Sequence, residues 1–131
     1  LLLLTNDGEL KRFLELPTSE LARRYRVRAH GVHNEKLISK LRAGIQIDGE
    51  KFRPMSVKLD KIQGSNIWYA VVLKEGRNRE IRRAFSEINL SVNRLIRISF
   101  GPFELGALPK GDVEEVPPTV HIEGWGSVAG V

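Results

Sequence analysis

The chain contains 131 residues, carries a formal net charge of +5 at pH 7 and has a pI of about 9.8. Its length, with apolar and charged fractions of 41% and 28%, indicates one globular domain with a core of its own. The sequence has no cysteine, which excludes disulfides, thiolate nucleophiles and cysteine-ligated metals and is compatible with a cytoplasmic location.

The first residues form an apolar run, Leu1–Leu4, that ends at a polar turn. The run predicts a buried strand over residues 1–5, followed by a turn in which Gly8 adopts a positive φ. It lacks the basic flank of a signal peptide and is too short to span a membrane. We expect the chain to begin inside this strand, as a fragment of a longer protein.

A helix and a basic strand are predicted next. Residues 9–16 place Leu10, Phe13 and Leu14 on one side of a helix, which Pro17 ends. From residue 24 to residue 29, arginines alternate with apolar or aromatic residues, which is the pattern of a half-buried strand with a basic outer face. The inward residues are Tyr25, Val27 and Ala29, and the outward residues are Arg24, Arg26 and Arg28.

The middle of the chain predicts a capped helix and two hairpins. Asn34 is placed to cap a helix that ends at Gly44, and Asp48-Gly49 is a strong hairpin signal. Two further strands, near residues 57–59 and over residues 67–73, flank a turn at residues 64–66.

The most informative segment is residues 74–97, in which basic residues outnumber acids by seven to three. Within it, Asn78 is predicted to cap an amphipathic helix, and a strand follows over residues 92–100. Six of the seven basic residues are arginine, whose planar fork matches phosphate oxygens. A folded arginine surface with few acids is typical of proteins that bind an anionic polymer. The seven are Lys74, Arg77, Arg79, Arg82, Arg83, Arg94 and Arg97.

Helices and hairpins follow one another without a regular strand–helix–strand repeat. We therefore predict an α+β fold with a mixed, largely antiparallel sheet and flanking helices. Residues 1–116 form the predicted domain, and residues 117–131, rich in Pro and Gly, are expected to be a loose tail. Residues 103–131 hold five acids and one base, a balance of −4, so residues 1–102 carry +9. The basic character therefore belongs to the body of the domain.

The sequence contains no phosphate-binding glycine loop, no Gly-x-Ser-x-Gly elbow and no HExxH pair. His30, His33 and His121 lack acids at ligand spacing, so we expect surface histidines and no metal site. Asp7 lies in a turn where a short carboxylate bonds its own backbone, and it is not a candidate nucleophile.

Four segments stand in order along the chain: LLLLTNDGEL, RRYRVRAHG, EGRNREIRRAF and VNRLIRISFGPFELGALPKG. Together they resemble the bacterial rRNA pseudouridine synthases of the RsuA-type family, over a range from Leu1 to about Val116. The resemblance implies the pseudouridine synthase catalytic fold, incomplete at the N-terminus. It also implies an enzyme that detaches a uridine base, rotates it and rejoins it through carbon, with no cofactor or metal. The implied partner is ribosomal RNA in the cytoplasm, without a membrane.

The site residues of that family fall on matching positions of this sequence. Tyr25 matches the tyrosine that stacks on the flipped base, Arg82 the arginine that pairs with the nucleophilic aspartate, and Leu95 an apolar residue of the base pocket. The aspartate belongs to a Gly-Arg-Leu-Asp motif that would lie just before Leu1, so the resemblance implies that the chain as given is inactive. Glu80 stands where the family often has glutamine. We assign the other basic residues of the segment to RNA contacts: Lys74, Arg77, Arg79, Arg83, Arg94 and Arg97.

Two alternatives stay open. A non-catalytic RNA-binding module on the same fold would carry the same arginines and would need no aspartate. A basic structural domain without a nucleic-acid partner would give Tyr25, Arg82 and Leu95 the ordinary roles of a core tyrosine, a surface helix charge and a strand core residue.

Overall fold

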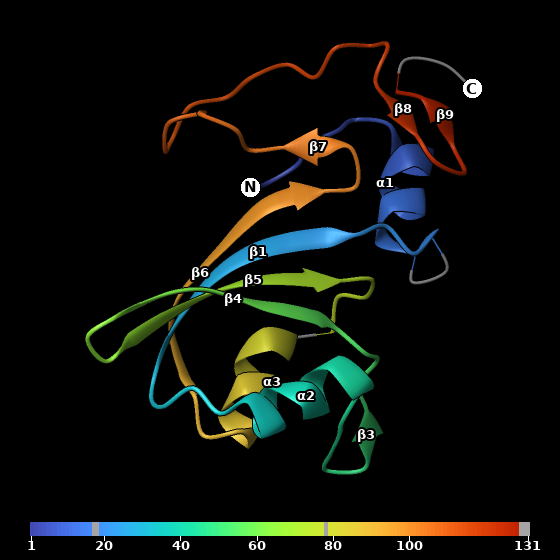
Figure 1. Ribbon diagram of the computed structural model, residues 1–131. Helices are drawn as coiled ribbons and strands as arrows, with labels where there is room; N and C mark the ends of the chain where they lie inside the picture. Colours follow the sequence, from blue (N-terminus) through green and yellow to red (C-terminus); the bar gives the residue numbers. More distant parts are fainter. Residues whose placement is uncertain (17–18, 78, 129–131) are drawn as a thin grey trace.

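A computed structural model of the protein describes residues 1–16, 19–77 and 79–128. These residues form helices and a five-stranded sheet with the strand order β4-β5-β1-β6-β7, in which every described pairing is antiparallel. Two helices, α2 and α3, lie together beside the sheet, and α1 lies with a small hairpin at the other end of the molecule (Figure 1). The arrangement confirms the predicted α+β class.

The helices are α1 (Gly8–Glu15), α2 (Glu35–Ala43) and α3 (Glu80–Glu87). The main sheet consists of β1 (Arg23–His30), β4 (Ser56–Gln63), β5 (Asn66–Leu73), β6 (Ser91–Phe100) and β7 (Phe103–Glu104). Two small hairpins pair β2 (Gln46–Ile47) with β3 (Glu50–Lys51), and β8 (His121–Ile122) with β9 (Gly126–Ser127).

The helix cap and the hairpin predicted for the middle of the chain are confirmed. Asn34 caps α2 by accepting hydrogen bonds from the backbone N–H groups of Lys36 and Leu37. The hairpin between β2 and β3 turns at Asp48 and Gly49, whose φ values of 51° and 80° are those that this tight connection requires.

The main core fills the space between one face of the sheet and helices α2 and α3. Alternate residues of β1 and β5 point into it, and the residues between them lie on the other face of the sheet, where β1 contributes arginines and β5 contributes Trp68. The core includes Val27, Ala29, Ile38, Leu41, Tyr69, Val71, Ile81 and Phe85. A second cluster joins α1 to the ends of β6, β7 and β8 through Leu10, Leu14, Phe100, Phe103 and Ile122.

The N-terminal segment differs from its prediction. Residues 1–5 form no strand, and Leu2 and Leu4 are 78% and 80% exposed. Apolar content predicts burial, but a strand also needs a ladder partner, and no described strand pairs with this segment. Gly8 does not adopt a positive φ, because it is the first residue of α1. Asp7 caps this helix, so its carboxylate does bond the local backbone.

The segment expected to be a loose tail contains a hairpin in its described part, residues 117–128. The β8–β9 hairpin buries Ile122 completely and places the Trp125 ring 5.4 Å from the Phe13 ring on α1. Pro and Gly content alone did not reveal this contact, and the domain boundary at residue 116 stays a prediction. The predicted cap Asn78 lies outside the described residues, and Arg79 occupies the N-cap position of α3. None of the helices described is both long and apolar enough for a membrane span.

Candidate active site and RNA interface

The basic segment folds into α3 and the strand that follows it. The apolar side of α3 is buried through Ile81 and Phe85, which leaves Arg79 exposed and Arg82 and Arg83 half-buried on its flanks. Arg79 adopts φ 54° and ψ 31°, a left-handed conformation that is uncommon for a residue with a side chain. The amphipathic pattern of α3 therefore gathers arginines around the start of the helix.

Arg82 is anchored to the neighbouring strand. Its Nη1 donates a 2.9 Å hydrogen bond to the carbonyl oxygen of Val92 on β6. Arg79 and Arg82 line an open hollow of about 560 Å³ beside the start of β6, together with His30 and Ser86. They also line a second hollow of about 340 Å³ that reaches Asp48 of the β2–β3 hairpin and Ser86. Two guanidinium groups at one opening are suited to hold a carboxylate or a phosphate.

Tyr25 and Leu95 lie on the face of the sheet that α2 and α3 cover. Both side chains are half-buried and pack against the main core. The β1–β6 register pairs Val27 with Leu95 and Tyr25 with Arg97, so Tyr25 and Leu95 lie close together on this face. The alternation in the sequence predicted the inward direction of Tyr25.

Tyr25 lines neither of the two hollows that Arg82 lines. Val92, which accepts the Arg82 hydrogen bond, pairs with Ala29, four residues along β1 from Tyr25. Four residues of a strand span about 13 Å. Tyr25 and the Val92 partner of Arg82 are therefore separated along the sheet. Leu95, in register with Val27, lies in the interval between them.

Two of the arginines assigned to RNA are paired within the chain. The guanidinium groups of Arg77 and Arg83 donate hydrogen bonds of 3.0 and 2.5 Å to the two carboxylate oxygens of Glu50. Both groups lie near the ring of Phe52, at 5.8 and 4.7 Å from its centroid. The hydrogen bond from Arg83, assisted by that from Arg77, lowers the pKa of Glu50. A phosphate at this place would compete with Glu50.

The other predicted RNA contacts are spread over both faces of the sheet. Lys74 and Arg79 are exposed near the start of α3. Arg94 is exposed on the opposite face, in register with Arg28. Arg97 is half-buried, donates a 2.9 Å hydrogen bond to the carbonyl oxygen of Leu1, and lies 5.0 Å from the centroid of the Phe100 ring. The predicted residues therefore do not form one continuous surface.

Sequence reasoning missed a buried pair of carboxyl groups beneath this segment. Glu75 and Glu80 are 9% and 3% exposed. Burial, followed by the hydrogen bond with Glu75, raises the pKa of Glu80 to about 7. Burial also disfavours ionisation of Glu75, but the N–H of Arg53 and the bond with Glu80 outweigh it and lower the pKa of Glu75. A proton on Glu80 can thus bridge the pair. One signal of this neutral group was available in the sequence. The resembled family often has glutamine at the position of Glu80, and glutamine is uncharged.

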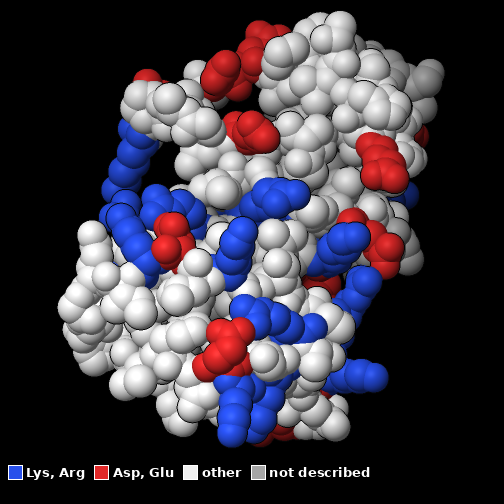
Figure 2. All heavy atoms as spheres, viewed as in Figure 1, with Lys and Arg blue, Asp and Glu red and all other residues white. Residues whose placement is uncertain are grey.

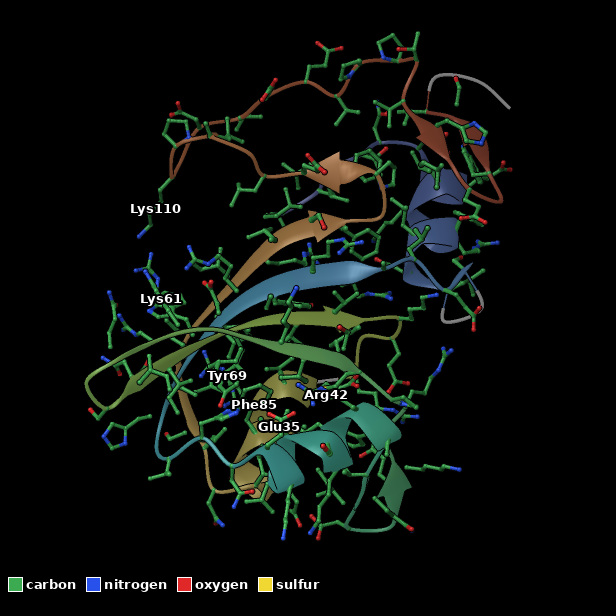
Figure 3. The ribbon with its side chains drawn as sticks, in the orientation of Figure 1. Glu35, Arg42, Lys61, Tyr69, Phe85 and Lys110 are labelled. Atoms are coloured by element: carbon green, nitrogen blue, oxygen red, sulfur yellow. The ribbon has the colours of Figure 1, made fainter. Side chains whose placement is uncertain are left out.

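His33 is a correction to the expectation of surface histidines. His30 and His121 are exposed, but His33 is half-buried, with Nδ1 2.8 Å from the Tyr69 hydroxyl and Nε2 3.1 Å from the Glu35 carboxylate. Glu35 also pairs with Arg42 on α2 (Figure 3). A buried tyrosine hydroxyl needs a partner, and His33 supplies it. Within the described ranges, no three His, Asp or Glu side chains come together as a possible metal site.

Relatives of known name match almost the whole chain. An uncharacterized RNA pseudouridine synthase of Rickettsia conorii is 49% identical over 116 residues, which are 88% of this chain and 50% of the relative. The chain is a homologue of RNA pseudouridine synthases over 88% of its length. A second relative, ribosomal large subunit pseudouridine synthase B of Haemophilus influenzae, is 41% identical over 117 residues, covering 88% of this chain and 33% of the relative. The resemblance that the four sequence segments indicated is confirmed.

The pseudouridine synthase fold is also found among solved structures. A crystal structure of pseudouridylate synthase has a TM-score of 0.62 at 23% identity, covering 76% of this chain and 43% of that one. An H/ACA RNP bound to a substrate RNA containing 2'-deoxyuridine has a TM-score of 0.54 at 19% identity, covering 73% and 32%. No family model matches the chain. The chain spans 50% of the length of the Rickettsia conorii relative and 33% of the length of the Haemophilus influenzae relative.

Proposed function

We propose that this chain is the part of an rRNA pseudouridine synthase that holds the target base, and that the nucleophilic aspartate lies on a segment upstream of Leu1. Large-subunit RNA in the cytoplasm is the first substrate to test, because the Haemophilus influenzae relative is named for it. One observation carries the proposal. In a chain 49% identical to a named RNA pseudouridine synthase, Tyr25 and Leu95 lie together on one face of the sheet.

Tyr25 would receive the uridine once it has left the RNA stack. Unstacking a base costs a few kcal/mol, and stacking on an aromatic side chain returns about 1–3 kcal/mol. The half-burial of Tyr25 holds its ring in place against the core. Leu95 would form the apolar wall of the same pocket. The Tyr25 phenolic oxygen is our candidate for the acceptor of the proton that leaves C5 of the base after the new carbon–carbon bond has formed.

Arg82 would pair with the aspartate and keep it ionised. A carboxylate in a closed pocket has a raised pKa unless a cation lies beside it. A guanidinium has five N–H donors, and the hydrogen bond to Val92 uses one of them. The upstream segment would enter the interval between Arg82 and Tyr25, and it would complete the pocket there. No cofactor or metal takes part in this scheme.

Release of tritium tests this proposal. The full-length protein is incubated with large-subunit and small-subunit rRNA transcripts that carry tritium at C5 of uracil, because pseudouridine formation releases that label. We expect release by the full-length protein and none by residues 1–131 alone. Absence of release from every transcript, with a protein shown to be folded, would contradict the proposal.

A second candidate is a non-catalytic RNA-binding module. It is favoured by one observation, that Tyr25 lines neither of the hollows beside Arg82. The two candidates differ in the sequence upstream of Leu1: a Gly-Arg-Leu-Asp segment supports the enzyme. A full-length protein that lacks this segment and binds rRNA without releasing tritium supports the module.

A further inference from the structure

A row of cations surrounds one tryptophan on the face of the sheet opposite α2 and α3. The strand register places Lys61 on β4, Trp68 on β5, Arg28 on β1 and Arg94 on β6 directly beside one another across four strands. Arg26 lies two residues before Arg28 on the same face. We call this set of residues (Arg26, Arg28, Lys61, Trp68, Arg94) the Trp68 face.

Trp68 holds the cations in place. The guanidinium carbons of Arg26 and Arg28 lie 4.6 and 5.7 Å from the centroid of the Trp68 ring, and Nζ of Lys61 lies 5.9 Å from it. Arg28 Nε also donates a 2.7 Å hydrogen bond to the side-chain oxygen of Asn93. These contacts order the cationic groups before a ligand arrives, which reduces the entropy lost on binding.

The Trp68 face is poorly neutralised by the chain itself. Arg28 and Arg94 stand directly opposite each other, and like charges in that relation destabilise a sheet. In the described part of the chain, Asp60 is the acid within ion-pair distance, 3.5 Å from Arg26, and both side chains are about half exposed, so the pair is weak. Figure 2 shows Lys and Arg side chains across the middle and lower parts of this view, with Asp and Glu side chains among them as well as in the upper part. The cations of the Trp68 face, with Asp60 beside Arg26, suit an anionic partner.

We propose that the Trp68 face binds the phosphate backbone of a second segment of the RNA substrate, away from the target uridine. The inference rests on the proposed function, because it takes RNA as the substrate. Tyr25 alternates with Arg26 on β1, so the two side chains point to opposite faces of the sheet. The RNA segment that reaches Tyr25 therefore cannot lie on the Trp68 face as well.

The chemistry of this face indicates phosphates rather than bases. Arg26 and Arg28 are separated by about 6.6 Å along the strand, an interval similar to that between successive phosphates of a nucleic-acid strand. Trp68 is 9% exposed, with cations lying over its ring, so it offers little surface to a base. Such a contact reads charge and position, not sequence.

The test compares two triple variants of the full-length protein. Arg26→Gln, Arg28→Gln and Arg94→Gln remove three charges from the Trp68 face. Arg12→Gln, Lys36→Gln and Lys40→Gln remove three charges from exposed positions of α1 and α2. Binding to an rRNA transcript is measured over a range of salt concentrations. We expect the slope of log K against log salt to fall by about 2 in the Trp68-face variant, at about 0.7 per contact, and to change little in the control. Equal slopes for the two variants would overturn the inference.

Three further readouts make the result specific. Tritium release by the wild-type full-length protein reports on the proposed function separately, so a wild-type salt slope in the Trp68-face variant, together with release by the wild-type protein, rejects the inference and leaves the proposed function standing. A lower slope with no release from any protein supports the surface and rejects the function. In a Trp125→Phe variant, Trp68 is the remaining tryptophan of residues 1–131, and RNA should change the part of the fluorescence that is lost when Trp68 is also replaced by Phe; no change in that part counts against the surface. If polyglutamate displaces the RNA as well as unlabelled RNA does at the same concentration of negative charges, the Trp68 face binds acidic proteins and the inference is rejected.

Discussion

The guanidinium of Arg82 on α3 donates a hydrogen bond to the carbonyl oxygen of Val92 on β6, at 2.9 Å. This bond ties the helix to the strand that carries Leu95. It fixes the position of a cation that, in the proposed site, faces the nucleophilic aspartate. The bond thus connects a feature of the fold to a role in the reaction.

Replacing Arg82 should abolish turnover more than it weakens the fold. Arg82→Gln removes the charge that keeps the aspartate ionised, and we expect tritium release to fall by about 100-fold or more. Arg82→Lys keeps the charge but loses the planar fork, so it should restore only part of the rate. Arg12→Gln, at an exposed position of α1, is the matched control. A wild-type rate in Arg82→Gln would remove Arg82 from the mechanism.

Replacing Glu50 should strengthen RNA binding. Glu50 competes with phosphate for the guanidinium groups of Arg77 and Arg83, so Glu50→Gln removes that competition, while Arg77 keeps its ion pair with Glu75. We expect the salt slope to rise by up to about 1.4, from two contacts of about 0.7 each. Glu104→Gln removes the same charge from an exposed position on β7 and serves as the control. An equal effect of both substitutions would mean that net charge, and not this ion pair, limits binding.

Replacing Glu80 should remove a dependence of stability on pH. Burial raises the pKa of Glu80 to about 7 in the folded chain, against about 4.3 for an unfolded glutamate. Between these values the folded state keeps a proton that the unfolded state has released, so the free energy of unfolding falls as pH rises and levels off above about pH 7. Glu80→Gln stays neutral throughout this range.

Denaturant unfolding at two pH values measures this effect. Glu80→Gln should match the wild type near pH 4 and exceed its stability by about 1–3 kcal/mol near pH 8. Glu123→Gln, an exposed position, provides the control. The same difference between Glu80→Gln and the wild type at both pH values would show that folding does not raise the pKa of Glu80.

Replacing Tyr69 should reduce stability by a small, defined amount. Its hydroxyl is bonded to His33, and burial raises the pKa of Tyr69 to about 12. Tyr69→Phe keeps the ring in the core and loses this bond, so we expect a loss of about 1 kcal/mol in the free energy of unfolding. A neutral result would mean that the His33 contact is replaced by solvent without cost.

The features that the sequence predicted correctly are those with local causes. The cap at Asn34 and the turn at Asp48-Gly49 depend on a few neighbouring residues, and alternation along β1 placed Tyr25 inward and the arginines outward. The strand predicted at residues 1–5 was wrong because composition does not report whether a ladder partner exists.

The parts of the site that sequence reasoning missed depend on distant contacts. Glu50 meets Arg77 and Arg83 across 27 and 33 residues of chain, and no pattern around either arginine indicates it. The row that contains Trp68 and Arg28 requires the registers of three strand pairs at once. Such contacts follow from the sheet topology, which the order of elements did not specify.

The central claim is that Tyr25 receives the target uridine, and turnover by Tyr25 variants tests it most directly. Tyr25→Leu removes the aromatic surface, about 1–3 kcal/mol of stacking, so tritium release by the full-length protein should fall by about 5- to 150-fold. Tyr25→Phe keeps the stacking surface and loses only the hydroxyl. It should therefore release tritium faster than Tyr25→Leu. A wild-type rate in folded Tyr25→Leu protein would contradict the account.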